Sequence, residues 1–182
     1  LAYVPNAEAA PDILRPSTND GFFTIGVGPH FFGFRSRAFR GRNFATRSQV
    51  KIGLDLGWHL EGDGEGPALG LGVENIFDDF GGAFFYAINP SFKFWWDIQV
   101  VDDMAIYVTP FGKAGAIFGF CDFCRSVEPA ANIGAGVEGR VVLEDRWMLF
   151  LRPVQLDTYI GDYFGETFFL GYSILAGGLI TF

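Results

Sequence analysis

The chain has 182 residues and a formal net charge of −8, and it contains 22 phenylalanines and 25 glycines. This length suits a single domain that fills a core or closes a small barrel, and the acidic balance argues against nucleic acid as a partner. No run of 18 or more uncharged apolar residues occurs, which excludes a transmembrane helix.

Residues 1–20 contain three prolines and no regular apolar pattern. We expect them to form an extended leader, which could plug a barrel formed by the rest of the chain or bind a neighbouring subunit. They lack the basic start and the apolar stretch of a signal peptide.

From residue 21 onward, apolar and polar or small residues alternate, which is typical of strands with two different faces. The pattern predicts eight strands, near residues 22–33, 48–60, 67–77, 83–98, 104–119, 130–143, 147–158 and 167–182. The clearest is the second, where six apolar residues occupy every other position from Val50 to Leu60. Its length suits the roughly 9–11 residues that a tilted strand needs to cross a bilayer.

Two of these strands have distinctive features. The strand at 147–158 begins with apolar residues on both faces, so its orientation is ambiguous, and Pro153 predicts a bulge or a strand end. In the last strand, counting back in twos from Phe182 to Phe168 gives one apolar face. An apolar face that ends on an aromatic residue is expected for the closing strand of a barrel in lipid.

The connections differ in length between the two ends of the predicted barrel. They are compact after the second, fourth and sixth strands and longer after the first, fifth and seventh; the short link at 78–82 is the exception. Outer-membrane barrels have short turns on the periplasmic side and longer loops outside. An even number of strands then places both termini on the periplasmic side.

The face opposite the apolar one carries charges. We expect them to point inward as a paired, partly hydrated network of Lys51, Asp55, Glu74, Lys93, Lys113, Glu138 and Arg140, with Arg152 as a less certain member. Burying an unpaired charge costs several kcal/mol, but a Lys or Arg that faces lipid near the midplane costs roughly 2–4 kcal/mol. Eight strands enclose only side chains or one small ligand, so we expect no open pore.

The prediction is therefore an all-β fold, an eight-stranded antiparallel up-and-down transmembrane β-barrel over residues 21–182, preceded by a periplasmic leader at 1–20. We expect interfacial aromatic girdles formed by Tyr86, Trp96, Trp147, Tyr159, Tyr163 and Tyr172. Trp58 and Phe182 are expected near the periplasmic rim.

The strand pattern, the alternating connections, Phe182 and the segment from Tyr107 to Gly115 resemble the small bacterial outer-membrane β-barrel proteins of the OmpA/OmpX type. The resemblance covers residues ~21–182 and includes no catalytic motif. It implies a place in the bacterial outer membrane, reached with a signal peptide that is absent from this chain. It also implies that Phe182 is part of the signal read by the barrel-assembly machinery.

The first long loop is rich in arginine, although the protein is acidic. It carries Arg35, Arg37, Arg40, Arg42 and Arg47. Since Arg binds phosphate bidentately, one hypothesis is that this loop contacts lipopolysaccharide phosphates or an acidic partner; the alternative is a solvated loop with incidental charge. Other expected partners are outer-membrane lipids and a protein bound through the loops or the leader.

The two cysteines, Cys121 and Cys124, lie close together in the chain. In an oxidising compartment they could form a loop disulfide. Reduced thiols, a redox motif and half of a zinc site are the alternatives, although only His30 and His59 are available as histidine ligands.

An enzyme that modifies lipid A or phospholipid is an alternative function. His30 is expected inside the barrel near the outer rim, beside Ser36 of the adjoining loop, whereas His59 is expected at the opposite end. A possible calcium site is an acidic outer rim that contains Asp78, Asp79, Asp122, Asp157 and Asp162, but its spacing matches no defined loop. We therefore assign no catalytic, metal-binding or cofactor-binding residue and expect no cofactor.

A soluble barrel that binds a hydrophobic ligand is a further alternative. The pattern favours instead an integral outer-membrane barrel with a structural role or an interaction role through its extracellular loops.

Overall fold

The described part of the computed structural model is one closed β-barrel. It comprises residues 19–33, 47–62, 64–79, 84–101, 105–121, 128–143, 146–163 and 166–182. The strands are β1 (Gly21–Gly33), β2 (Arg47–His59), β3 (Gly66–Asp79), β4 (Phe84–Gln99), β5 (Ile106–Cys121), β6 (Glu128–Leu143), β7 (Trp147–Tyr163) and β8 (Glu166–Thr181). Within these ranges, no helix is long and apolar enough to span a membrane.

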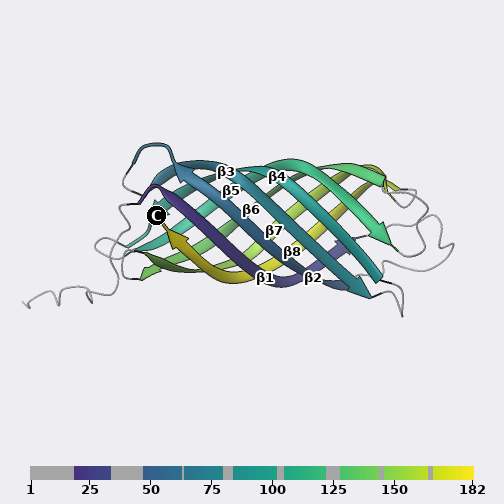
Figure 1. Ribbon diagram of the computed structural model, residues 1–182, viewed down its shortest axis with the longest axis horizontal. Helices are drawn as coiled ribbons and strands as arrows, with labels where there is room; N and C mark the ends of the chain where they lie inside the picture. Colours follow the sequence, from purple (N-terminus) through teal and green to yellow (C-terminus); the bar gives the residue numbers. More distant parts are fainter. Residues whose placement is uncertain are drawn as a thin grey trace, which may run out of the picture.

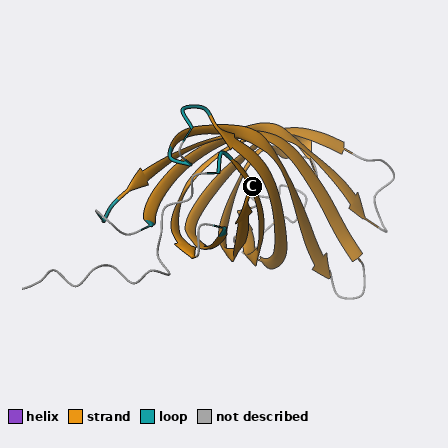
Figure 2. Ribbon diagram, turned by 60° about the vertical axis from the view of Figure 1, so that its left-hand side comes forward, coloured by secondary structure: helices purple, strands orange, loops and turns teal. Residues whose placement is uncertain are grey.

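Each strand pairs antiparallel with the next one in the chain, and β8 pairs with β1 to close the barrel (Figure 1). The strands are inclined to the barrel axis (Figure 2), as closure of a sheet requires. The predicted fold class and all eight predicted strands are confirmed. Residues 1–18 of the predicted leader lie outside the described residues.

The barrel has two ends, a terminal rim and a distal rim. The terminal rim carries Gly21 and Phe182, whose backbones exchange two hydrogen bonds, and the connections after β2, β4 and β6 are on this rim. The distal rim carries Gly33 and Arg47, and the remaining connections join strands there (Figure 1).

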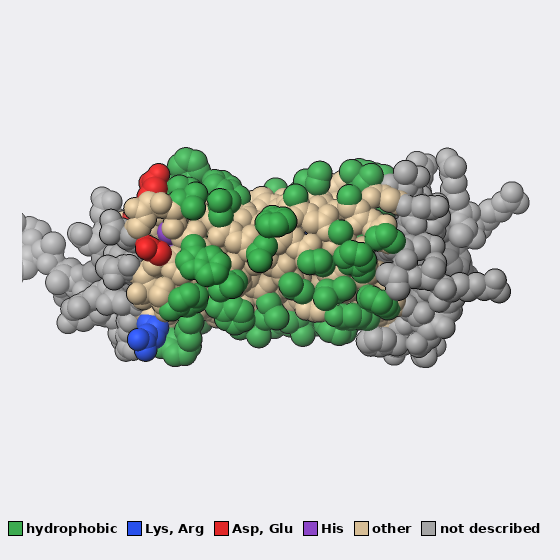
Figure 3. Space-filling model, turned by 45° about the horizontal axis from the view of Figure 1, so that its top comes forward, with side chains coloured by type: hydrophobic (Ala, Val, Ile, Leu, Met, Phe, Trp, Pro, Cys, Tyr) green, Lys and Arg blue, Asp and Glu red, His purple; other side chains and the backbone are tan. Residues whose placement is uncertain are grey.

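The outward faces of the strands are apolar. On β2, Val50 and Trp58 are about half exposed, whereas Lys51 and Asp55 on the opposite face are buried. In Figure 3 apolar side chains are spread along the wall, and the charged side chains visible among the described residues lie at the terminal rim. A soluble ligand-binding barrel would have the reverse distribution, so the structure supports the transmembrane interpretation.

A bulge changes the face on which β7 residues lie. Pro153 and Val154 both point outward, and together they stand opposite the single residue Ile174 of β8. One extra residue shifts the two-residue period, so Gln155 and Asp157 point inward. The bulge predicted from Pro153 is confirmed.

Most of the predicted interfacial aromatic residues lie on the outer face. Trp58, Trp96 and Trp147 are exposed near the terminal rim, while Tyr86 and Tyr172 are half-buried on the outer face, Tyr86 near the distal rim. Tyr159 was predicted wrongly: it is buried inside, because it follows the bulge in β7. The side chain of Tyr163 lies outside the described residues.

Candidate functional site

Ten charged side chains meet in the middle of the barrel. They are Lys51, Asp55, Glu74, Lys93, Asp97, Lys113, Glu138, Arg140, Arg152 and Asp157, and none is more than 5% exposed. Five are cations and five are anions, so the formal charges of this set cancel. They come from β2 to β7, and each reaches the interior because alternate residues of a strand point to the same face.

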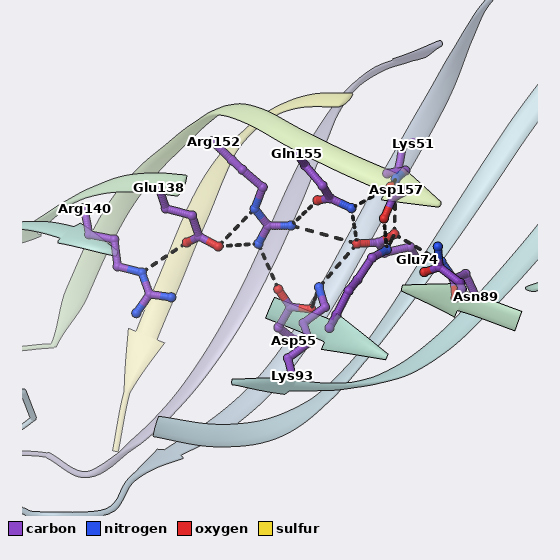
Figure 4. A network of polar contacts seen from close by, with 12 residues as sticks. Lys51, Asp55, Glu74, Asn89, Lys93, Glu138, Arg140, Arg152, Gln155 and Asp157 are labelled. Atoms are coloured by element: carbon purple, nitrogen blue, oxygen red, sulfur yellow. Dashed lines mark hydrogen bonds and ion pairs between the residues drawn. The ribbon is translucent and has the colours of Figure 1, made fainter. Parts of the chain in front are cut away.

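Glu74 lies among three lysines. One of its oxygens, Oε2, is 3.1 Å from Lys51 Nζ and also accepts from Lys113, and the other, Oε1, is 3.3 Å from Lys93 Nζ. Gln155 donates to Oε1 at 2.9 Å. Figure 4 shows Lys51, Lys93 and Gln155 around this carboxylate.

Asp157 is the second anion that these lysines share. It lies 2.9 Å from Lys51 Nζ and 2.7 Å from Lys113 Nζ, so each of the two lysines bridges Asp157 and Glu74. Gln155 also donates to Asp157 at 2.9 Å. Every member of this group thus has more than one partner, as a buried polar network requires.

Arg152 connects this group to the terminal half of the barrel. It pairs with Asp55 at 3.1 Å and with Glu138, and it donates to Gln155 at 2.8 Å. Its guanidinium carbon also lies 4.4 Å from the centre of the Phe111 ring, a cation–π contact. Glu138 continues the chain of ion pairs to Arg140 at 3.1 Å (Figure 4).

Asp97 is at the terminal end of the network. Arg140 Nη1 contacts both of its oxygens, at 3.1 and 2.9 Å, Thr109 donates to it, and His59 Nε2 is 2.8 Å away.

Inward glycines make room for these side chains. A Cβ at Gly72 would lie 2.5 Å from Lys93 Cε, and one at Gly134 would lie 2.7 Å from Lys113 Cε. A larger residue at either position would therefore displace a lysine from its carboxylate.

Two apolar layers pack against the network. The terminal apolar layer consists of Phe22, Ala68, Trp95, Ala105, Tyr107, Phe111, Val142, Met148 and Leu179. The distal apolar layer consists of Phe32, Ile76, Phe85, Ala87, Ile117, Ala130, Tyr159 and Phe169. In the distal layer, the Tyr159 and Phe169 rings stack at 4.6 Å, and Phe32 packs edge-on against both. The terminal layer packs among the charges, since Arg140 and Arg152 lie over the Phe22 and Phe111 rings.

The structure brings together all seven charges that the sequence analysis placed inside, and Arg152 with them. Asp97, Gln155 and Asp157 are further members that were not predicted from the sequence. Asp97 lies four residues after Lys93 on β4, so both point to the same face of the strand, and the alternation could have indicated it. Asp157 was expected at the outer rim, which is incorrect, because the bulge at Pro153 and Val154 turns it inward.

His30 is buried in the distal half of the barrel, where its Nδ1 lies 2.7 Å from Ser173 Oγ. Phe32 and Tyr159 pack edge-on against its ring. Ser36, the expected partner, lies outside the described residues. His59 is at the opposite end of the barrel, near the terminal rim.

Several candidate sites fall wholly or partly outside the described residues. Of the five loop arginines, only the backbone of Arg47 is described, in register with Phe32. Cys121 ends β5, but its side chain and Cys124 are not described, so the disulfide stays a prediction. Among the described residues, no group of three or more His, Cys, Asp or Glu is placed to hold a metal ion.

No protein-family model and no curated protein sequence matches the chain. Solved structures do match. Neisserial surface protein A (NspA) has a TM-score of 0.65 at 10% sequence identity, over 89% of this chain and 97% of that one. Ail, the attachment invasion locus protein of Yersinia pestis, has a TM-score of 0.59 at 13% identity, over 90% and 99% of the two chains. The chain has the fold of the small outer-membrane β-barrels.

A major outer membrane protein from Thermus thermophilus has the same fold, with a TM-score of 0.53 at 13% identity over 89% of this chain and 99% of that one. The likeness extends over nearly the whole length of each of these barrels, and it concerns the fold. At this sequence identity a shared fold does not imply a shared function.

Proposed function

We propose that this protein is an integral protein of the bacterial outer membrane that forms no open pore and has a structural or interaction role. The observation that carries the proposal is the distribution of charge: ten paired charges are buried inside, and the outer wall is apolar. An apolar wall is compatible with contact to the hydrocarbon of a bilayer. A lysine or arginine that faced lipid near the midplane would destabilise the barrel by roughly 2–4 kcal/mol.

The filled interior supports the absence of a pore. Ion pairs connect Lys51 to Asp97 through Glu74, Arg152, Glu138 and Arg140. Apolar side chains fill the interior around the terminal end of this path and in the distal half of the barrel. A hydrated ion would have to displace these side chains to pass.

Conductance tests this part of the proposal. The purified protein is inserted into planar bilayers, and an open porin in the same bilayers serves as the control for insertion and detection. We expect no current above that of the bare bilayer. Steady current steps that grow with salt concentration would contradict the proposal.

The interaction we propose is with phosphate groups of lipopolysaccharide, through the loop that joins Gly33 of β1 to Arg47 of β2. The chain has 13 Lys and Arg residues, and five lie in the interior network, which leaves eight. Five of those eight are Arg35, Arg37, Arg40, Arg42 and Arg47. The positive charge outside the interior network is thus concentrated in the segment that joins β1 to β2. We expect the rim at which this segment begins and ends to face outward, as the rim with the longer loops does in outer-membrane barrels.

A solved neighbour supports an anionic ligand for this kind of barrel. Ail of Yersinia pestis has been crystallised in complex with the heparin analogue sucrose octasulfate, and that structure has a TM-score of 0.54 with this chain. Sulfate and phosphate offer similar oxygen acceptors to the planar guanidinium group of arginine.

The test is to replace all five arginines by alanine and to measure the lipopolysaccharide that co-purifies with each barrel. We expect it to fall, and we expect a five-lysine variant to retain part of it, since lysine keeps the charge but loses the bidentate geometry. The control is Arg146→Ala, because Arg146 is an exposed arginine on the terminal rim. Unchanged co-purification in the five-alanine variant would remove the proposal.

A further inference from the structure

His59, the last residue of β2, contacts the residue that precedes β1. Its backbone N–H donates to the carbonyl oxygen of Asp20 at 2.8 Å, and its ring Nδ1 lies 3.1 Å from the same oxygen. The other ring nitrogen, Nε2, lies 2.8 Å from Asp97 Oδ2. The imidazole is shielded from solvent and packs against Phe22 at a centroid distance of 5.4 Å.

The two partners of the ring determine its charge. A backbone carbonyl and an ionised carboxylate can only accept hydrogen bonds, so each ring nitrogen must carry a proton. Asp97 is an ionised acceptor because Arg140 contacts both of its oxygens and Thr109 donates to it. Only an imidazolium at His59 can donate both of these hydrogen bonds at once.

The neutral ring could keep only one of these hydrogen bonds. Retaining the bond to the charged Asp97 is favoured, because hydrogen bonds to ionised groups are the stronger ones. The Nδ1 lone pair would then face the lone pairs of the Asp20 carbonyl oxygen, which is repulsive. We propose that His59 is a proton-dependent contact that holds the start of β1 to the end of β2, and that this contact loosens when the ring loses its proton.

Other charged and titratable groups lie around this ring. Asp97 and Arg140 face it from β4 and β6. Tyr107 of β5 lies in the same apolar layer as Phe22, and its hydroxyl donates to Glu65 at 3.1 Å. The adjoining chain also carries Asp20 and Glu61. The folded state holds the protonated ring through two acceptors, so the contact is strongest when the ring is protonated and weakens when the ring loses its proton.

The contact is at the point where residues 1–18 join the barrel. Asn19 also donates to Thr181 of β8 at 3.2 Å, and Gly21 pairs with Phe182. His59 would thus make the attachment of residues 19–21 to the rim depend on the protonation of its ring. This inference does not depend on the membrane or lipopolysaccharide proposals.

The first experiment is nitrogen NMR of the histidine rings in the full-length protein in lipid nanodiscs, between pH 5 and 8.5. We expect both nitrogens of His59 to be protonated at the acidic end and one at the basic end. A ring that is neutral throughout, or charged throughout, would overturn the proposal. This measurement needs no variant and so does not depend on whether a variant folds.

The second experiment is hydrogen exchange at the backbone amide of residue 59, which donates to Asp20, corrected for the intrinsic pH dependence of exchange. We expect protection to fall about tenfold or more between pH 6 and pH 8.5, as expected for loss of a hydrogen bond to a charged group. The variant His59→Gln should show no such change, whereas His30→Gln should behave like the original protein, because the chain has only these two histidines. A change that persists in His59→Gln would show that another group is responsible and would refute the proposal.

Discussion

On β2, Lys51 and Asp55 point into the barrel, while Ile52, Leu54 and Leu56 of the same strand point outward. The inward residues have defined partners on other strands: Lys51 pairs with Glu74 and Asp157, and Asp55 with Lys93 and Arg152. The outward residues have mostly apolar neighbours: Ile25 and Val73 lie on either side of Leu54. No ion pair holds them to those neighbours.

The two faces of the barrel differ in how strictly they constrain the residue at each position. A buried charge that loses its partner is strongly destabilising, so the interior depends on the identity of each residue. Hydrocarbon solvates any apolar side chain, so the outer face depends only on polarity. A substitution or deletion that affects the interior should therefore cost more stability than one that affects only the outer face.

Deleting Val154 should have the largest effect. It removes one residue of the bulge, so Gln155, Asp157 and Tyr159 would exchange faces along the distal part of β7. Asp157 would leave Lys51 and Lys113 and face lipid, and we expect no folded barrel. Electrophoresis with and without heating checks this, since a folded barrel migrates differently before heating. The control Pro153→Ala keeps both residues of the bulge and should fold.

Replacing Glu74 by Gln should destabilise the folded barrel by about 3–5 kcal/mol, the usual loss when one partner of a buried ion pair is removed. Three lysines, at positions 51, 93 and 113, would lose their shared anion. Urea unfolding followed by tryptophan fluorescence measures the change. The matched control is Glu61→Gln, because Glu61 is an exposed residue of the β2–β3 turn, where we expect a change within about 0.5 kcal/mol. Equal unfolding midpoints for the two variants would mean that the network contributes little.

Replacing Leu54 by Lys tests the outer face near the middle of β2. A lysine facing lipid near the midplane should destabilise the barrel by about 2–4 kcal/mol in vesicles. Leu54→Ala should have a much smaller effect, because it introduces no charge. If the lysine variant is as stable as the alanine variant, the outer face does not meet hydrocarbon.

Replacing Tyr172 by Phe should have the smallest effect, a destabilisation of about 1 kcal/mol. The Tyr172 hydroxyl donates to the carbonyl oxygen of Pro153 at 2.9 Å, on the outer face beside the bulge. Phenylalanine keeps the ring, which stacks on Phe31, but leaves this carbonyl without its donor. Comparison with Phe31→Leu, which removes the stacked ring and keeps the hydrogen bond, separates the two contributions to the unfolding free energy.

Much of the fold could be predicted because its main signal is local. Alternation on β2 is visible within a few residues, and the inward Lys51 and outward Leu54 follow from it directly. The same counting failed for Asp157 and Tyr159, because a single extra residue at the bulge reverses every later assignment on β7.

The candidate site was predictable only in part for a related reason. Strand parity indicates that Lys113 and Glu74 both point inward, but not that they touch, since they lie on strands that are not adjacent in the sheet. The hydrogen bond between His30 and Ser173 likewise joins residues 143 positions apart in sequence. Neither contact can be predicted from the alternation of residues within one strand.

The amino-acid order by itself determined the number of strands, the apolar outer face and the presence of charge inside, because a two-residue period is a property of one strand at a time. Closure of the sheet decided the rest. It set which lysine meets which carboxylate, packed apolar side chains against the network, and brought both ring nitrogens of His59 against acceptors. These outcomes depend on strand stagger and on one bulge, which become defined only when all eight strands pair around the barrel.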